Sequence, residues 1–124
     1  MELGPIWPTI PCTDFERAKG FYVDKLGLKV SKDMPEMEMA MFDTGGQSGF
    51  VLFKRGPFTC DHTVAGWAVE DVEAAVKDLA DKGVTFEQYP ELKTDEMGIS
   101  RMGGGMCAWF KDTEGNILSV NSKM

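Results

Sequence analysis

The chain has 124 residues, of which 43% are hydrophobic and 27% charged, and this composition is ordinary for one compact globular domain. Its 13 basic and 20 acidic residues give a net charge of −7, which would repel a phosphate backbone and argues against nucleic-acid binding. The sequence contains no apolar run of membrane-spanning length, no signal-like N-terminal segment and no C-x-x-C pair, which together predict a cytoplasmic protein without membrane contact.

The first half of the chain predicts one strand, one helix and three further strands. Residues 6–12 are expected to form a strand, and Thr13 and Glu16 have the spacing of a capping box that opens a helix. Apolar residues recur on one face of this helix, and Gly27 ends it by accepting a left-handed conformation. Three more strands are predicted at 28–32, 38–42 and 49–54.

The second half repeats this order of elements. A strand at 64–69 precedes a helix at 70–82, which Gly83 ends, and a strand at 84–89 follows. Residues 90–102 form the least regular stretch of the sequence. The last two strands are predicted at 106–110 and 117–121, separated by the turn sequence 112–116.

A direct comparison of the two halves supports an internal repeat. Sliding the first half by 57 positions gives five identities over positions 13–25, namely Asp14 with Asp71, Glu16 with Glu73, Ala18 with Ala75, Asp24 with Asp81 and Lys25 with Lys82. Two unrelated amphipathic helices with acidic starts would be the alternative explanation. The repeat is favoured because one strand–helix–three-strand unit cannot easily bury both faces of its sheet alone.

Several motifs in order resemble the vicinal-oxygen-chelate superfamily, which includes glyoxalases, bleomycin-resistance proteins and extradiol dioxygenases. Segment 10–28 combines an acidic helix start with Ala18, then Phe21-Tyr22 and Leu26-Gly27, as the first strand and helix of that superfamily do. The second half has the matching segments 69–76 and 82–84. Residues 110–116 resemble the Asp-Pro-Asp-Gly-Asn turn of the superfamily, with Thr113 in place of the proline.

This resemblance implies an α+β fold in which two βαβββ modules form a half-open barrel around a cavity. The modules are expected at 1–56 and 62–124, within one glyoxalase-like domain. Many members of the superfamily are homodimers, so a homodimer is also expected here.

The resemblance also locates the four positions that hold a divalent metal ion in metal-dependent members. Alignment of the two halves places these positions at Trp7, Phe50, Val64 and Ser119. None of these side chains is a good ligand for such an ion, which needs several imidazole, carboxylate or thiolate groups. We therefore expect neither a metal ion nor another cofactor.

Strand alternation predicts which side chains line the cavity instead. The expected ligand-binding residues are Trp7, Thr9, Phe50, Val64, Gly66, Ile117 and Ser119. They would form a mainly apolar pocket suited to a small hydrophobic or aromatic molecule. The leading hypothesis is thus a metal-free binding protein of the glyoxalase and bleomycin-resistance type.

Two alternatives remain open at this level. The chain is an enzyme of the same superfamily, of lyase, isomerase or dioxygenase type, if His62 acts as a general base in an atypical site. A solvent-facing loop position is the simpler interpretation of that histidine. The other alternative is a regulatory subunit that uses the fold to bind another protein.

Overall fold

A computed structural model describes residues 1–123 of the chain. By internal contacts the chain divides into two units, Met1–Thr59 and Cys60–Met124, and each is described by itself below. Among the described residues no helix is both long and apolar enough to cross a membrane.

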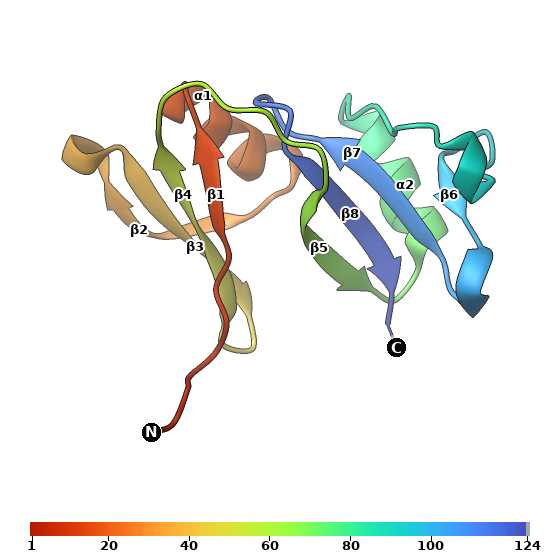
Figure 1. Cartoon of the computed structure of the whole chain (residues 1–124), viewed down its shortest axis with the longest axis horizontal. Coiled ribbons are helices and arrows are strands. Elements are labelled where there is room, and N and C mark those ends of the chain that lie inside the picture. Colours follow the sequence, from red (N-terminus) through yellow and green to blue (C-terminus); the bar gives the residue numbers. More distant parts are fainter. Residues whose placement is uncertain (124) are drawn as a thin grey trace. The chain divides into compact units, whose positions relative to one another are not determined.

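The first unit is a βαβββ module (Figure 1). Its elements are β1 (Thr9–Cys12), α1 (Phe15–Gly20) with a π-helical turn at Phe21–Lys25, β2 (Lys29–Met34), β3 (Met39–Gly45) and β4 (Ser48–Lys54). The sheet order is β1-β4-β3-β2, with β1 parallel to β4 and the other pairs antiparallel. The predicted strands are confirmed, each with slightly different bounds.

Asp14, rather than Thr13, caps the first helix. The Arg17 amide donates to Asp14 Oδ1 at 3.2 Å, which satisfies one of the amides left open at a helix start. Gly27, with φ +68°, leaves the helix in the left-handed conformation as predicted. The capping-box prediction therefore found the helix start but assigned the cap one residue too early.

The core of the first module lies between its helix and one face of its sheet. Tyr22, Phe42 and Phe50 are fully or almost fully buried there. The Phe42 and Phe50 rings stack with centroids 4.7 Å apart, and Tyr22 contacts Phe50 at 5.0 Å. Such aromatic clusters combine a large buried apolar area with favourable ring contacts.

The second unit has the same sheet order, β5-β8-β7-β6. Its elements are β5 (Thr63–Val69), α2 (Val72–Asp81), β6 (Ile99–Ser100), β7 (Cys107–Lys111) and β8 (Ile117–Ser122). Asp71 caps α2 by accepting from the Ala74 amide at 3.0 Å, as Asp14 caps α1. Both modules are thus βαβββ units, and the predicted α+β fold class is confirmed.

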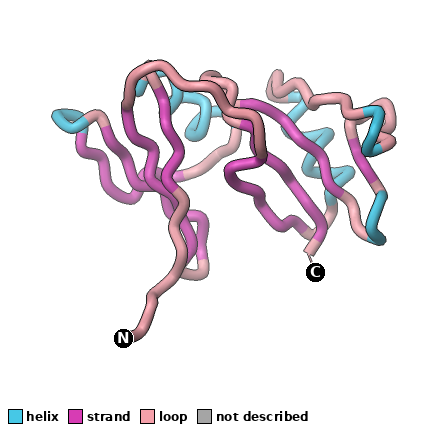
Figure 2. The backbone as a smooth tube through the Cα atoms, in the orientation of Figure 1, coloured by secondary structure: helices cyan, strands magenta, loops and turns pink. Residues whose placement is uncertain are grey.

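The fourth strand of the second module differs from the prediction. Residues 84–89 contribute only an isolated bridge between Phe86 and Phe110, and the strand β6 forms from the stretch predicted to be irregular. Figure 2 shows residues 84–98 as loop with one short helical turn, Pro90–Leu92. The edge of this sheet is therefore shared by two short segments, each of which pairs with part of β7.

Strand register explains this difference. In the first strands, Thr9 of the first module corresponds to Gly66 of the second, an offset of 57 residues. Thr9 pairs with Val51, and Gly66 pairs with Ser119, which is the counterpart of Val51. In the last hairpins the offset is 68 residues. The pair Met41 and Val51 of the first module corresponds there to the pair Trp109 and Ser119 of the second. The second module therefore has 11 more residues between its helix and its last hairpin, and these residues divide the edge strand.

Candidate functional site

Each sheet has one face covered by the helix of its own module and one face that this helix does not cover, here called the open face. In the second module, the register places on the open face Cys107, Trp109, Lys111, Ile117, Ser119, Asn121, Gly66 and Ala68. The alternate residues Ala108, Phe110, Leu118 and Val120 are buried on the helix side. The open face is therefore where small molecules have access to the sheet.

The open face of the second module contains a shallow depression of about 360 Å³. Trp109 and Ile117 come from the sheet, and Tyr89 and Leu92 come from the loop that follows α2. The Tyr89 and Trp109 rings meet edge to face with centroids 5.4 Å apart. An apolar floor with two aromatic rings suits a flat organic molecule.

The rim of the depression is polar and includes Asp61, His62, Thr63 and Glu91. Burial, reinforced by the charge of Glu87, raises the pKa of Tyr89. Its hydroxyl therefore stays protonated at neutral pH and is available as a hydrogen-bond donor at this site.

His62 lies on this rim and is exposed. Its Nδ1 is 3.0 Å from Asp61 Oδ1, and the hydrogen bond from His62 lowers the pKa of the Asp61 carboxyl. The side chains of both residues are largely in solvent, with exposed fractions of 72% and 92%. This pair has the orientation of a base held by a carboxylate, but it lacks the burial that usually tunes a catalytic histidine.

Ser119 is nearly buried at the centre of the same face. Gly66 lies beside it on β5, and a Cβ at Gly66 would collide with Ser119 Oγ, so the glycine makes room for the serine hydroxyl. The neighbouring Cys107 is half-buried, and burial raises the pKa of its thiol. At neutral pH this cysteine is a thiol rather than a thiolate, which makes it a poor nucleophile.

The first module has an open face of its own. The register places Thr9, Val51, Met39 and Met41 on it, all on strands. Trp7 lies just before β1, where its indole Nε1 donates to the Gln47 carbonyl at 2.9 Å. Its ring packs over Gly49, where a Cβ would come within 2.7 Å of the indole.

Phe50 lies on the face opposite to the predicted one. It is 2% exposed and stacks on Phe42 in the core, so it has no access to the open face. The register shows that Val51, not Phe50, corresponds to Ser119. The prediction displaced the last hairpin by one residue, and in a strand such a shift exchanges the two faces.

The remaining predicted site residues divide between the two modules. Gly66, Ile117 and Ser119 share the open face of the second module, and Thr9 lies on the open face of the first. Val64 falls at the register irregularity between Thr63 and Ala65. Trp109 and Tyr89 were not predicted as site residues. Trp109 could have been found from the sequence, because it stands two positions from Cys107 and from Lys111 in a strand and therefore lies on the same face as they do.

The residues at the superfamily's metal positions do not fit a divalent ion. With the register corrected, these positions hold Trp7, Val51, Val64 and Ser119, of which two are aliphatic and one is an indole already bonded to a carbonyl. Within residues 1–123 no group of three or more His, Cys, Asp and Glu side chains is placed to hold a metal ion.

Comparison with known proteins gives one family model and one relative in sequence. A family model described as bleomycin resistance protein-like N-terminal matches residues 6–45. The protein YraH of Bacillus subtilis (strain 168) is 27% identical over 121 residues, which cover 86% of this chain and 88% of that protein.

Two solved structures cover nearly the whole chain. UcmS2 is 28% identical with a TM-score of 0.78, over 99% of this chain and 100% of its own. TnmS3, an antibiotic binding protein from Streptomyces sp. CB03234, is 23% identical with a TM-score of 0.78, over 100% of this chain and 99% of its own. The fold of all 123 described residues is therefore that of these proteins.

Proposed function

We propose that this chain, which belongs to the vicinal-oxygen-chelate superfamily, binds a small hydrophobic or aromatic molecule without the help of a metal ion. The binding surface is the open face of the second module, in the depression that Trp109, Tyr89 and Ile117 line. The Tyr89 hydroxyl and the polar rim residue Thr63 supply the contacts that orient the molecule.

The edge-to-face pair of Trp109 and Tyr89 carries this proposal. Aromatic side chains that remain half-exposed on a sheet face gain contact area when a flat molecule covers them. The rings are already fixed against each other, so little side-chain entropy is lost on binding. The similarity to a bleomycin resistance protein-like family and to the antibiotic-binding TnmS3 supports the same class of activity.

Native mass spectrometry of the protein as purified, under conditions that retain metals and small ligands, is the first test. A metal-free chain with or without an additional organic mass agrees with the proposal. One divalent ion bound per chain would contradict it and would favour an enzyme.

A fluorescence titration with 2-naphthol then tests the surface itself. The substitution Trp109→Ala should weaken binding about 10-fold, because it removes the ring that forms the floor of the depression. Trp67→Phe is the matched control, since Trp67 lies on the helix side of the same sheet. Equal effects of the two substitutions would contradict the assignment of the open face.

An enzyme built on the same depression is the second candidate, and the contact between His62 and Asp61 is the observation that favours it. In this version Asp61 orients the imidazole, and the other ring nitrogen accepts a proton from a substrate bound against Trp109. Once a substrate is found, His62→Gln should abolish turnover and leave ligand binding intact. Unchanged turnover would exclude this role.

A further inference from the structure

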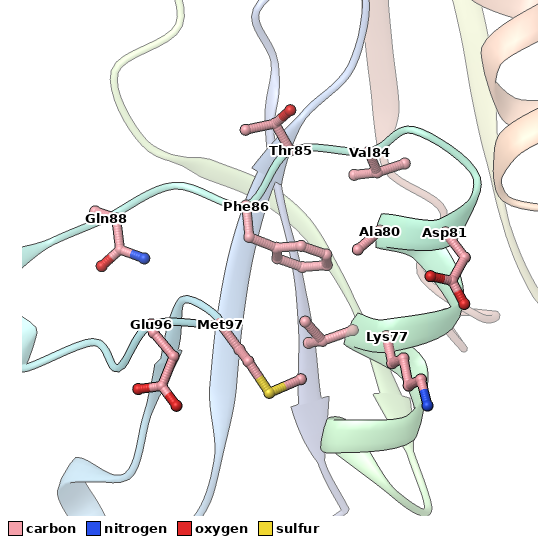
Figure 3. Close-up of a pocket in the computed structure, with 10 residues that line it drawn as sticks. Lys77, Ala80, Asp81, Val84, Thr85, Phe86, Gln88, Glu96 and Met97 are labelled. Carbon is pink, nitrogen blue, oxygen red and sulfur yellow. The ribbon is translucent and has the colours of Figure 1, made fainter.

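The second module contains a hollow on its helix side, apart from the open face, that the proposed function does not use. It has a volume of about 390 Å³ and lies between α2 and the segments around Phe86 and Met97 (Figure 3). This is within the range of small-molecule pockets. The segment that forms its outer wall belongs to the stretch in which the second module has 11 more residues than the first.

The wall opposite the helix is held in place by the Asp95 side chain. Asp95 Oδ1 accepts from the amides of Met97 and Ile99, both at 2.9 Å, and its Oδ2 accepts from Arg101 at 2.6 Å. Gln88 Nε2 donates to the Asp95 carbonyl at 3.0 Å and ties the two loop segments together. The wall is therefore fixed before any ligand arrives, which lowers the entropic cost of binding.

Close packing at Gly98 adds to this rigidity. A Cβ at Gly98 would come within 2.9 Å of Phe86 Cβ, so the loop can approach the Phe86 segment only because residue 98 is glycine. Phe86 in turn packs edge to face on Phe110 in the core, with centroids 5.5 Å apart. In Figure 3 the Met97 side chain extends from the loop toward α2, past the Phe86 ring.

The floor of the hollow is apolar and its rim is charged. Val76 and Val84 are buried, and Phe86 and Met97 are half-buried. Among the ten lining residues, Asp81 and Glu96 carry negative charges and Lys77 a positive one, so the lining has a net charge of −1.

The geometry points to a second binding site here, for a small organic ammonium ion with an aromatic or aliphatic tail. The tail lies on the Phe86 and Met97 side chains, which are polarizable and adapt to ligand shape. The ammonium group lies at the rim beside Glu96 on the loop, which Figure 3 shows on the opposite side of the hollow from Lys77 and Asp81 on α2. The overall charge of −7 favours the approach of a cation.

The test uses three ligands of similar shape and different charge: 2-phenylethylamine, phenylalanine and 3-phenylpropionate. Each is titrated into the full chain that carries ¹³C-methyl methionine, and the Met97 methyl resonance is assigned with Met97→Leu. We expect 2-phenylethylamine to move the Met97 signal with saturation and to bind at least several-fold more tightly than the other two. Equal or tighter binding of phenylalanine or 3-phenylpropionate would overturn the assignment of ligand charge.

Two variants locate the site. Glu96→Gln should weaken binding of the amine about 3- to 10-fold, since the Glu96 carboxylate is exposed to solvent. Glu36→Gln in the first module removes the same charge from an exposed position and should leave binding unchanged. Ala80→Leu places a larger side chain at the hollow in a helix that tolerates it, and should abolish the Met97 response.

The variant Trp109→Ala separates this inference from the proposed function, because it changes only the open face. Amine binding should persist in Trp109→Ala and be lost in Ala80→Leu. A Met97 signal that does not respond to the amine, or a response that survives Ala80→Leu, would show that the hollow is not a binding site.

Discussion

At the scale of single residues, Phe50 is a position whose sheet face was predicted wrongly from the sequence. The strand around it was predicted, but its face depended on aligning the two hairpins without a gap. Asp43 pairs with Gly49 as Lys111 pairs with Ile117, so Asp43 corresponds to Lys111 and not to Asp112. The similar Asp-Thr dipeptides at 43–44 and 112–113 favoured the wrong alignment, and one position was enough to exchange the faces.

The corrected position of Phe50 leads to a stability prediction. The substitution Phe50→Ala should lower the free energy of unfolding by about 3–5 kcal/mol, because it opens a cavity beside Phe42 and Tyr22. Val51→Ala, on the half-exposed neighbour, should cost about 1 kcal/mol. Urea unfolding followed by circular dichroism measures both. Similar losses for the two variants would mean that Phe50 is not a core residue.

At the scale of elements, the strands and helices with strong local signals were predicted well. Asp14 and Asp71 each precede an amphipathic run, and both cap a helix by the same contact. Gly27 and Gly83 both adopt positive φ at the predicted helix ends. Local chemistry determines these features, which is why one sequence was sufficient to find them.

The segment after α2 could not be predicted in the same way. Residues 84–89 have the composition of a strand, but the longer connection in this module leaves them only one bridge to β7. What holds the segment is the side chain of Asp95, which bonds two amides and Arg101. Such contacts depend on how a loop folds back on itself, and no periodic pattern reports them.

Asp95 gives a prediction with a defined pH dependence. Although burial acts in the opposite direction, the hydrogen bonds from Arg101 and from the Ile99 and Met97 amides lower the pKa of Asp95 below its ordinary value of 3.8. A carboxyl with a lowered pKa stabilises the fold above its unfolded-state pKa, and this contribution is lost as the pH falls through the folded-state value. Asp95→Asn should therefore be less stable than the native chain at pH 7, by about 1–3 kcal/mol.

The difference between Asp95→Asn and the native chain should shrink as the pH is lowered past 3.8, because the Asp95 carboxyl then takes up a proton in the unfolded chain before it does so in the folded chain, and it should disappear once the pH falls below the lowered folded-state pKa. Urea unfolding at a series of pH values measures this. Glu36→Gln, which removes a charge of the same sign from an exposed position, is the control and should show no such convergence. A constant difference across the series would contradict a role for the ionised Asp95.

At the scale of the whole molecule, the repeat and the ordered motifs were enough to predict two βαβββ modules. The candidate binding site was harder to predict, because its aromatic floor comes partly from a loop. Trp109 is on a predicted strand, but Tyr89 reaches it only through the connection after α2. The sequence placed Ile117 and Ser119 on the open face, but it did not predict the Trp109 and Tyr89 rings that make this face aromatic.

The open faces also bear on the assembly of the chain. Each sheet has a helix of its own module on one face only, while half-buried Met39, Met41 and Phe53 lie on the open face of the first module and Trp109 on that of the second. Apolar side chains in this number on a sheet face favour burial against another surface. We therefore expect a homodimer, with these faces contributing to the buried area.

Light scattering coupled to gel filtration measures the mass directly. The native chain should elute with twice the mass of one 13.7 kDa chain. Met41→Glu places a charge on the open face of the first module and should shift the equilibrium toward single chains, because an unpaired charge is costly to bury in an interface. Thr59→Glu adds the same charge at an exposed position between the modules and should leave the mass unchanged. A native chain that stays at 13.7 kDa at every concentration would contradict the predicted homodimer.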